Sequence, residues 1–427
     1  MKKILIIFLA FIACTAACKK EETSTDSSTD FKDAIILNEP KIYGDSVVVL
    51  TWSIKDRSKF KSIVIIRNDN INNAPPSFIG VSLDSSQYID TLIPYCPRFD
   101  YNIRGYIKGT NSQFYFSNSY YFFDNEISKF EIKPTNILHD KENKFIYFFE
   151  SNGNISLYDI AKKAIIKTVT IGNGNGNCDF GYYNGVQELY IPDDNGWLYV
   201  YDAQNLTEIT KFNVGNSLTS VVENNNILFI SNTLGFDNSL IAFDRATGKN
   251  ISTQVTDKIV CLKKVSNTQT NLWALCESSW NNFSYFQYNN QNNPINSPNQ
   301  LSLTFPADIF TFPFESSPQG NYMLFSSGGN IITQDYIIKY NLPKGNYKFS
   351  SFTIDKENNR ILGTTSSKTI EVYDATTFKF IKSIRTKTYP MHVVIQNNRL
   401  ICVGSLVNLT QDNYSNTDKI TVEELKY

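Results

Sequence analysis

The octapeptide Asp140-Lys-Glu-Asn-Lys-Phe-Ile-Tyr147 decides the fold, because a copy of it returns far downstream as Asp355-Lys-Glu-Asn-Asn-Arg-Ile-Leu362. A second pair, Ile155-Ser-Leu-Tyr-Asp159 and Ile370-Glu-Val-Tyr-Asp374, follows the two octapeptides. In both pairs the copies are 215 residues apart, which is five times 43. A fixed spacing of this kind predicts a repeated structural unit.

Related peptides occur between these copies and after them. They are Leu198–Asp202, Leu240–Asp244 and Phe283–Gln287, then Tyr336–Tyr340, which an insertion displaces, and Val422–Leu425 as the seventh. Each unit has room for about four short strands separated by polar turns, with these peptides as the third strands. A period near 43 with four strands per unit is typical of a β-propeller. Residues 126–427 are therefore predicted to form an all-β, seven-bladed propeller.

The ends of this region predict how the ring closes. The last repeat, Lys419–Lys426, stops at its third strand, whereas Glu126–Ile132 is an alternating strand without a blade of its own. Pairing the two would complete the seventh blade and remove exposed strand edges.

The repeat resembles the YVTN-type and quinoprotein-like propeller superfamily. Ala242–Lys249 is also similar to one repeat of quinone dehydrogenases, but the docking Trp is absent and the other copies lack Thr-Gly. No quinone or other cofactor is therefore expected. Paired Gly-His and Trp-Asp marks are missing, which argues against the WD-repeat family.

Residues 33–125 carry short alternating runs that predict a small β-sandwich: Val47–Trp52, Ser62–Ile66, Phe78–Val81, Tyr101–Tyr106 and Gln113–Phe116. Leu50–Ser53, Ser86–Leu92 and Tyr101–Tyr106 resemble the Trp strand, the corner segment and the Tyr strand of a fibronectin type III domain. Another immunoglobulin-like sandwich is the alternative. The resemblance implies a spacer or docking module.

The N-terminus predicts export. Lys2 and Lys3 precede an apolar run, Ile4–Ala13, which is too short to span a bilayer. Thr15–Cys18 resembles the lipobox of bacterial lipoproteins, which implies that residues 1–17 are a signal peptide and that Cys18 is acylated. An ordinary secretory signal is the alternative, and Cys14 is a weaker lipidation site.

The segment after Cys18 predicts where the protein resides. Residues 18–32 form a polar, flexible tether, and Lys19–Glu22 resembles a surface-export tag of some Gram-negative groups. The expected location is the outer membrane, at the cell surface or otherwise facing the periplasm, with the lipid as the membrane anchor.

Charge and residue counts exclude several classes of function. Lys and Arg number 40 against 41 Asp and Glu, so there is no basic excess for a nucleic-acid partner. His139 and His392 are the two histidines; neither has a motif partner, so both are expected to be structural, and no metal site is expected. Cys261 and Cys276 lie in neighbouring predicted strands, where they either bridge or remain buried thiols.

The candidate ligand-binding residues lie in loops between predicted second and third strands. These loops are rich in Asn, Ser and Asp, and the candidates in them are Asp193, Asp194, Trp197, Phe236, Trp280 and Tyr414. Aromatic platforms beside amide donors suit sugars or planar ligands; ordinary loops with inward-folded aromatics are the alternative. Asp193–Gly196 is expected to be a hairpin turn rather than a calcium loop, and Gly172–Asn177 a connector between blades.

These observations predict a non-catalytic, envelope-anchored binding protein for a glycan, a small nutrient or a protein. One alternative, by analogy of fold, is capture of a corrinoid-type nutrient for an outer-membrane transporter. Another is a lyase or hydrolase on a propeller scaffold, against which the scarcity of His argues.

Overall fold

The computed structural model describes residues 33–43, 47–69, 75–93, 95–110, 113–124, 126–172, 174, 176–234, 237–256, 258–264, 271–277, 283–289, 299–305, 314–325, 328–333, 338–408 and 419–427. The predicted signal peptide 1–17, the lipidation site Cys18 and the tether 18–32 lie outside these residues.

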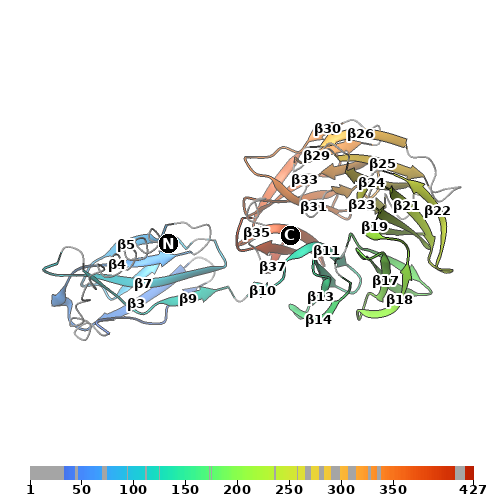
Figure 1. Cartoon of the computed structure of the whole chain (residues 1–427). Coiled ribbons are helices and arrows are strands. Elements are labelled where there is room, and N and C mark those ends of the chain that lie inside the picture. The colour runs from blue at the N-terminus through green and yellow to red at the C-terminus, as the bar shows by residue number, and fades with distance from the viewer. Residues whose placement is uncertain are drawn as a thin grey trace, which may run out of the picture. The chain divides into compact units, whose positions relative to one another are not determined.

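The described chain is all-β and divides into two compact units (Figure 1). The first comprises Met1–Pro94 with Arg98–Phe123, and the second comprises Tyr95–Pro97 with Asp124–Tyr427. The described residues contain one short 3-10 turn, η2 (Arg57–Lys59), and no helix of the length and apolarity that a membrane span requires.

The first unit contains two antiparallel sheets. In one, β3 (Val47–Ile54) pairs with β1 (Ile35–Leu37), β2 (Lys41–Tyr43) and β6 (Gln87–Asp90). The other has the order β5 (Ser77–Val81), β4 (Phe60–Asn68), β7 (Arg98–Ile107), β8 (Phe114–Phe116), and β9 (Tyr120–Phe123) also pairs with β7. Four of the five strands predicted for this region lie within these bounds, and the fifth, Gln113–Phe116, is one residue longer than β8.

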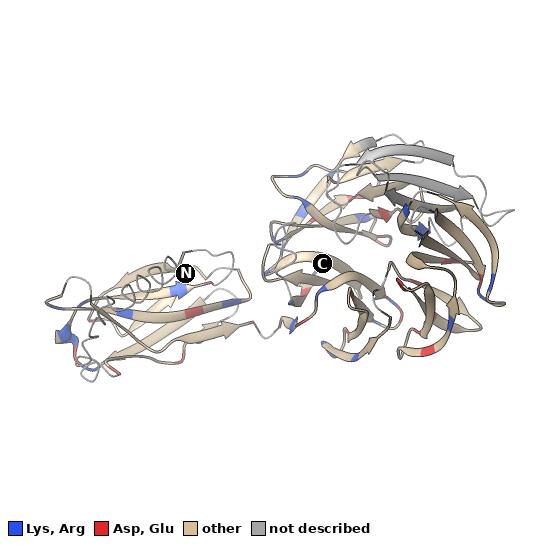
Figure 2. Ribbon diagram, in the orientation of Figure 1, with Lys and Arg blue, Asp and Glu red and all other residues tan. Residues whose placement is uncertain are grey.

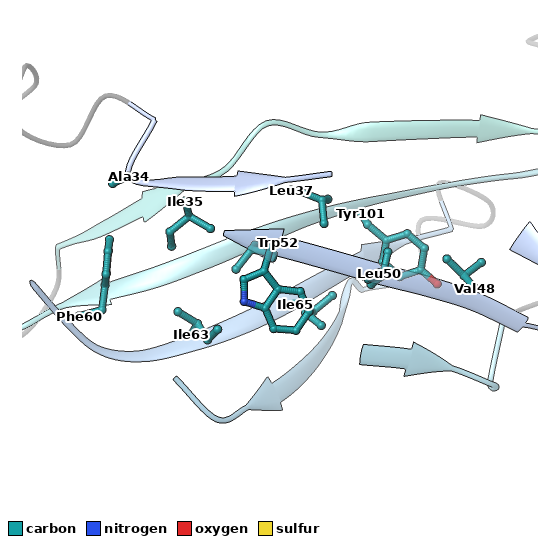
Figure 3. Close-up of a cluster of buried hydrophobic side chains, with 11 residues drawn as sticks. Ala34, Ile35, Leu37, Val48, Leu50, Trp52, Phe60, Ile63, Ile65 and Tyr101 are labelled. Carbon is teal, nitrogen blue, oxygen red and sulfur yellow. The ribbon is translucent and has the colours of Figure 1, made fainter. Parts of the chain in front are cut away.

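Alternating side chains of the two sheets form one core (Figure 3). Leu50 and Trp52 of β3 are buried together with Ile63 and Ile65 of β4, as the period of two in a strand requires. Burial of this apolar surface is the main force that holds the sheets together.

A buried carboxylate joins the two sheets of the first unit. Asp90 Oδ2 accepts hydrogen bonds from Tyr101 Oη and from Arg67 Nη1, each at 2.7 Å. Burial and the bond to Asp90 raise the pKa of Tyr101 well above its ordinary value. Tyr101 therefore stays protonated and acts as a permanent donor.

The second unit repeats a four-stranded antiparallel sheet seven times among its described residues. Six sheets follow chain order: β11 (Pro134–Asp140), β12 (Phe145–Glu150), β13 (Asn154–Asp159), β14 (Ala164–Thr170); β15 (Asp179–Tyr183), β16 (Val186–Pro192), β17 (Trp197–Asp202), β18 (Thr207–Asn213); β19 (Ser217–Asn224), β20 (Ile227–Leu234), β21 (Asp237–Asp244), β22 (Lys249–Val255); β23 (Lys258–Lys264), β24 (Asn271–Glu277), β25 (Phe283–Asn289), β26 (Asn299–Phe305); β27 (Phe314–Ser316), β28 (Tyr322–Phe325), β29 (Asn330–Thr333), β30 (Ile338–Asn341); β31 (Phe349–Asp355), β32 (Arg360–Thr365), β33 (Thr369–Asp374), β34 (Phe380–Arg385).

The seventh sheet combines the two ends of the region. Its order is β35 (Tyr389–Gln396), β36 (Arg399–Ser405), β37 (Ile420–Lys426), β10 (Ser128–Phe130). The predicted pairing of 126–132 with the last strand is confirmed, since Ser128, Lys129 and Phe130 lie opposite Val422, Thr421 and Ile420.

One predicted third strand is wrong. Tyr336–Tyr340 was expected to be the third strand of its unit, but β30 (Ile338–Asn341) is the fourth strand, and β29 (Asn330–Thr333) is the third. Aromatic and β-branched residues suit an outer strand as well as an inner one, so the composition of this peptide does not distinguish the two positions.

The repeated aspartates have a structural cause. Asp140 Oδ1 accepts the backbone N–H groups of Glu142 and Asn143 at 3.0 and 3.1 Å, and Asp355 Oδ1 accepts those of Glu357 and Asn358 at 3.1 and 3.3 Å. Side-chain caps of this kind fix a tight turn between adjacent strands. The octapeptide therefore repeats because each copy builds the same turn between first and second strands.

A second set of aspartates ends the third strands. Asp159, Asp202, Asp244 and Asp374 each accept the N–H groups two and three residues ahead. Four residues after each aspartate the backbone has a positive φ, at Lys163, Leu206, Gly248 and Phe378. Gly248 is the residue that adopts this conformation without strain, which explains the isolated Thr-Gly of that repeat.

Cys178, Cys261 and Cys402 are buried free thiols. In the ladder of β23 with β24, Cys261 lies opposite Leu275, and Cys276 lies opposite Ile259. The bridge between Cys261 and Cys276, left open by the sequence, is therefore not formed.

Candidate functional site

Asp193 lies beneath the connector between the first two sheets of the second unit. Asp193 is fully buried, and a Cβ added to Gly172 would lie 2.4 Å from its Oδ1. Its backbone forms the expected hairpin turn, because Gly196 N donates to Asp193 O at 3.0 Å. The residue thus packs against the glycine-rich connector and does not present its carboxylate on the surface.

Asp194 and Trp197 lie nearer to solvent. Asp194 is exposed, and Trp197 is half-buried at the start of β17. Lys211 Nζ of β18 lies 5.4 Å from the centroid of the Trp197 ring and 5.6 Å from that of Tyr199. Phe236, Trp280 and Tyr414 lie outside the described residues.

The second unit contains a cavity of about 410 Å³ that the sequence did not predict. Every one of its seven sheets contributes lining residues from its first strand, namely β11, β15, β19, β23, β27, β31 and β35. Asp193, Asp194 and Trp197 are absent from its described lining.

The rim of the cavity and the predicted loops lie at opposite ends of the strands. Pro318 and Lys356 line it from turns between first and second strands, whereas Asp194 belongs to a turn between a second and a third strand. In an antiparallel sheet, successive hairpin turns lie at opposite ends of the strands. The cavity and the predicted loops are therefore two separate places.

Two ion pairs cross between strands in the cavity. Lys263 Nζ of β23 lies 3.5 Å from Glu315 Oε2 of β27, and Lys264 Nζ lies 3.7 Å from Asp179 Oδ2 of β15. The Lys263 and Glu315 side chains are 36% and 35% exposed, which leaves both accessible from the cavity. Glu315 raises the pKa of Lys263 despite the opposing effect of burial, so the lysine is charged at neutral pH.

Both histidines of the chain also line the cavity. His139 Nε2 lies 3.0 Å from Gln396 Oε1, and His392 Nδ1 lies 3.0 Å from Ser351 Oγ. Burial lowers the pKa of His139. Burial, and after it the charge of Lys263, lowers the pKa of His392 to about 3. Both rings are therefore neutral at neutral pH, and each has a hydrogen-bond partner.

The described lining of the cavity provides neither a cluster of metal ligands nor a thiolate. No group of three or more His, Cys, Asp or Glu side chains in the described part of the chain could hold a metal ion. Burial raises the pKa of the Cys178 thiol well above its usual range and that of Cys261 to about 11. Thiols of this kind are poor nucleophiles at neutral pH.

Sequence patterns did not reveal this site because its residues come from segments far apart in the chain. His139 and Lys263 belong to different repeats, and each stands close to the end of a first strand. An alignment of the first strands of the repeats would have shown that these residues occupy similar positions.

No protein-family model and no curated protein matches this chain.

Proposed function

We propose that this protein is an envelope-anchored, non-catalytic binding protein in which a fibronectin-type sandwich carries a seven-bladed propeller with a ligand site in its central cavity. The observation that carries the proposal is the cavity itself, to which each of seven four-stranded sheets contributes its first strand. Radial stacking of sheets around a central channel is the architecture of a propeller.

The volume and lining of the cavity support a small polar ligand. Ligand pockets commonly enclose about 300–1,000 Å³ with a few polar groups that orient the ligand. Lys263, Glu315, Lys264 and Asp179 provide charged groups of both signs, and Ser316 adds a hydroxyl. Figure 2 shows that Lys and Arg are interspersed with Asp and Glu over the described strands of the second unit.

The anchor and location come from the N-terminal sequence. Acylated Cys18 would hold the protein at the outer membrane, and the sandwich would act as a spacer. In the nutrient-capture version of this proposal, the bound molecule passes to an outer-membrane transporter.

A ligand screen by thermal shift tests the proposal, because a ligand that binds the native state raises the melting temperature. Glu315→Gln is expected to abolish the shift caused by a hit, whereas Trp197→Ala is expected to preserve it. If Trp197→Ala abolished the shift in melting temperature and Glu315→Gln preserved it, the ligand would bind at the predicted loops instead of in the cavity.

A lyase or hydrolase is the second candidate, favoured by the two histidines that line the cavity. A base whose pKa is about 3 binds a proton poorly at neutral pH, so His392 is badly suited to this role. Turnover of a bound ligand that His139→Gln or His392→Gln abolishes, with binding unchanged, would establish catalysis.

A further inference from the structure

We propose, resting on the function above, that the ligand is an acidic oligosaccharide that extends from the cavity along a groove between two neighbouring sheets. The groove lies between the sheets β27–β30 and β31–β34 and has a volume of about 450 Å³. It shares Pro318, Ile354 and Lys356 with the cavity, so the two spaces adjoin.

The groove runs outward from the cavity. Its shared residues lie at the ends of the first strands, and Tyr340 at its far side belongs to the fourth strand, β30. Three spacings between neighbouring strands correspond to about 14 Å. A single sugar ring would leave much of this length empty, so an elongated ligand fits better.

The lining of the groove suits a hydroxyl-rich ligand. Tyr340 is 49% exposed, and its ring centroid lies 5.4 Å from that of Phe378. Asn321, Asn359 and Thr376 add amide and hydroxyl groups to the lining of the same groove. Exposed aromatic faces with adjacent amides bind sugar rings through stacking and hydrogen bonds.

The charge of Lys356, where the groove meets the cavity, favours an acidic ligand. Lys263 and Lys264 each face a carboxylate, whereas exposed Lys356 has no carboxylate partner among the described residues. Asp355, next to it, is buried and accepts bonds from Glu357 N and Asn358 N within its own turn. The Lys356 ammonium group is therefore available where the groove meets the cavity, and an anionic group of the ligand would pair with it.

The test measures binding of the full chain in detergent to three acidic series of increasing length: galacturonate oligomers, alginate oligomers and sulfated glycosaminoglycan fragments. Each series is paired with its neutral counterpart, obtained by reducing the carboxylates and, for the glycosaminoglycan fragments, by also removing the sulfates. At least one acidic series is expected to bind more tightly with length and to lose about tenfold in affinity when neutralised.

Variants locate the contact. Lys356→Gln is expected to weaken binding of the acidic series about tenfold and leave the neutral series unchanged. Tyr340→Ala is expected to remove the gain with length. Lys249→Gln, an exposed lysine on β22, is the matched control and should change nothing. Melting curves of all three variants verify that they fold.

Two results overturn the proposal. One is that none of the three acidic series binds; the other is that binding survives both Lys356→Gln and Tyr340→Ala. If a small ligand from the thermal-shift screen still depends on Glu315 in either case, the proposed function stands and only the acidic oligosaccharide is refuted.

Discussion

Ser128 lies directly opposite Val422, in the ladder that joins β10 to β37. β10 also reaches the next sheet, because the ring of Phe130 packs edge-on against Tyr158 of β13 with the centroids 5.5 Å apart. The first strand of the second unit thus holds the last sheet and the first sheet together.

Deleting residues 419–427 is expected to unfold the whole second unit. The deletion removes β37, so β10 loses its partner and β36 keeps only β35. It also removes Ile420 and Val422 from the core and uncovers the side chains that they pack against. Scanning calorimetry would show loss of the second unit's transition. A melting curve close to that of the intact chain would contradict this role of β37.

Replacing Glu423 by Gln is expected to change how stability depends on pH. Burial raises the pKa of Glu423 to about 7, although Lys387 N donates to both carboxylate oxygens and the charge of Lys387 opposes the shift. Because this pKa exceeds that of the unfolded chain, stability is full below about pH 4.5 and falls as the pH rises through 7.

The free energy of unfolding that is lost at high pH because of Glu423 is at most on the order of 3 kcal/mol. Glu423→Gln should therefore stabilise the protein at pH 8 and change it little at pH 4.5, as measured by urea unfolding at both values. Exposed Glu357→Gln is the matched control. If the two variants showed the same dependence of stability on pH, a raised pKa of Glu423 would be excluded.

Replacing His392 tests the opposite pH range. Its pKa lies below that of an unfolded histidine, so its contribution to stability is full above about pH 6.5 and is lost as the pH falls toward 3. Because the chain has two histidines, an NMR titration of their ring protons can be assigned with His139→Gln. The His392 resonance is expected to keep its neutral shift down to pH 5; titration near 6.5 would refute the buried, neutral ring.

The strands could be predicted because local chemistry specifies them. Asp140 and Asp374 accept hydrogen bonds within their own turns, so the residues of each turn are enough to predict it. β29 escaped prediction because it is short and lacks an aspartate at its end, and its neighbour β30 carried the more visible aromatic pattern.

The cavity could not be predicted in the same way. Lys263 and Glu315 meet only because two sheets place their first strands side by side, and neither residue has a local motif. The aromatic loops were visible in the sequence, but composition alone did not show that Asp193 is buried under Gly172.

Cys18→Ser is expected to abolish envelope association and acylation. The serine hydroxyl cannot replace the thiol that the lipidation machinery modifies, so soluble or unprocessed protein should accumulate. Cell fractionation and labelling with a fatty-acid analogue measure both effects. Cys14→Ser is the matched control and should remain acylated; an acylated Cys18→Ser variant that stays with the envelope would contradict the anchor.

Tyr101→Phe is expected to destabilise the first unit by about 1–2 kcal/mol, because it removes one of the two donors to the buried Asp90 Oδ2 and leaves the packing of the ring intact. Arg67 Nη1 still reaches the same oxygen at 2.7 Å, which limits the loss. Trp52 packs in the same core, so urea unfolding followed by its fluorescence reports on this unit once the other three tryptophans have been replaced by Phe in both variants. Tyr121→Phe, at a residue that is 77% exposed, is the control and should leave stability within experimental error. Equal stability of the two variants would show that the Tyr101–Asp90 bond does not hold the sheets together.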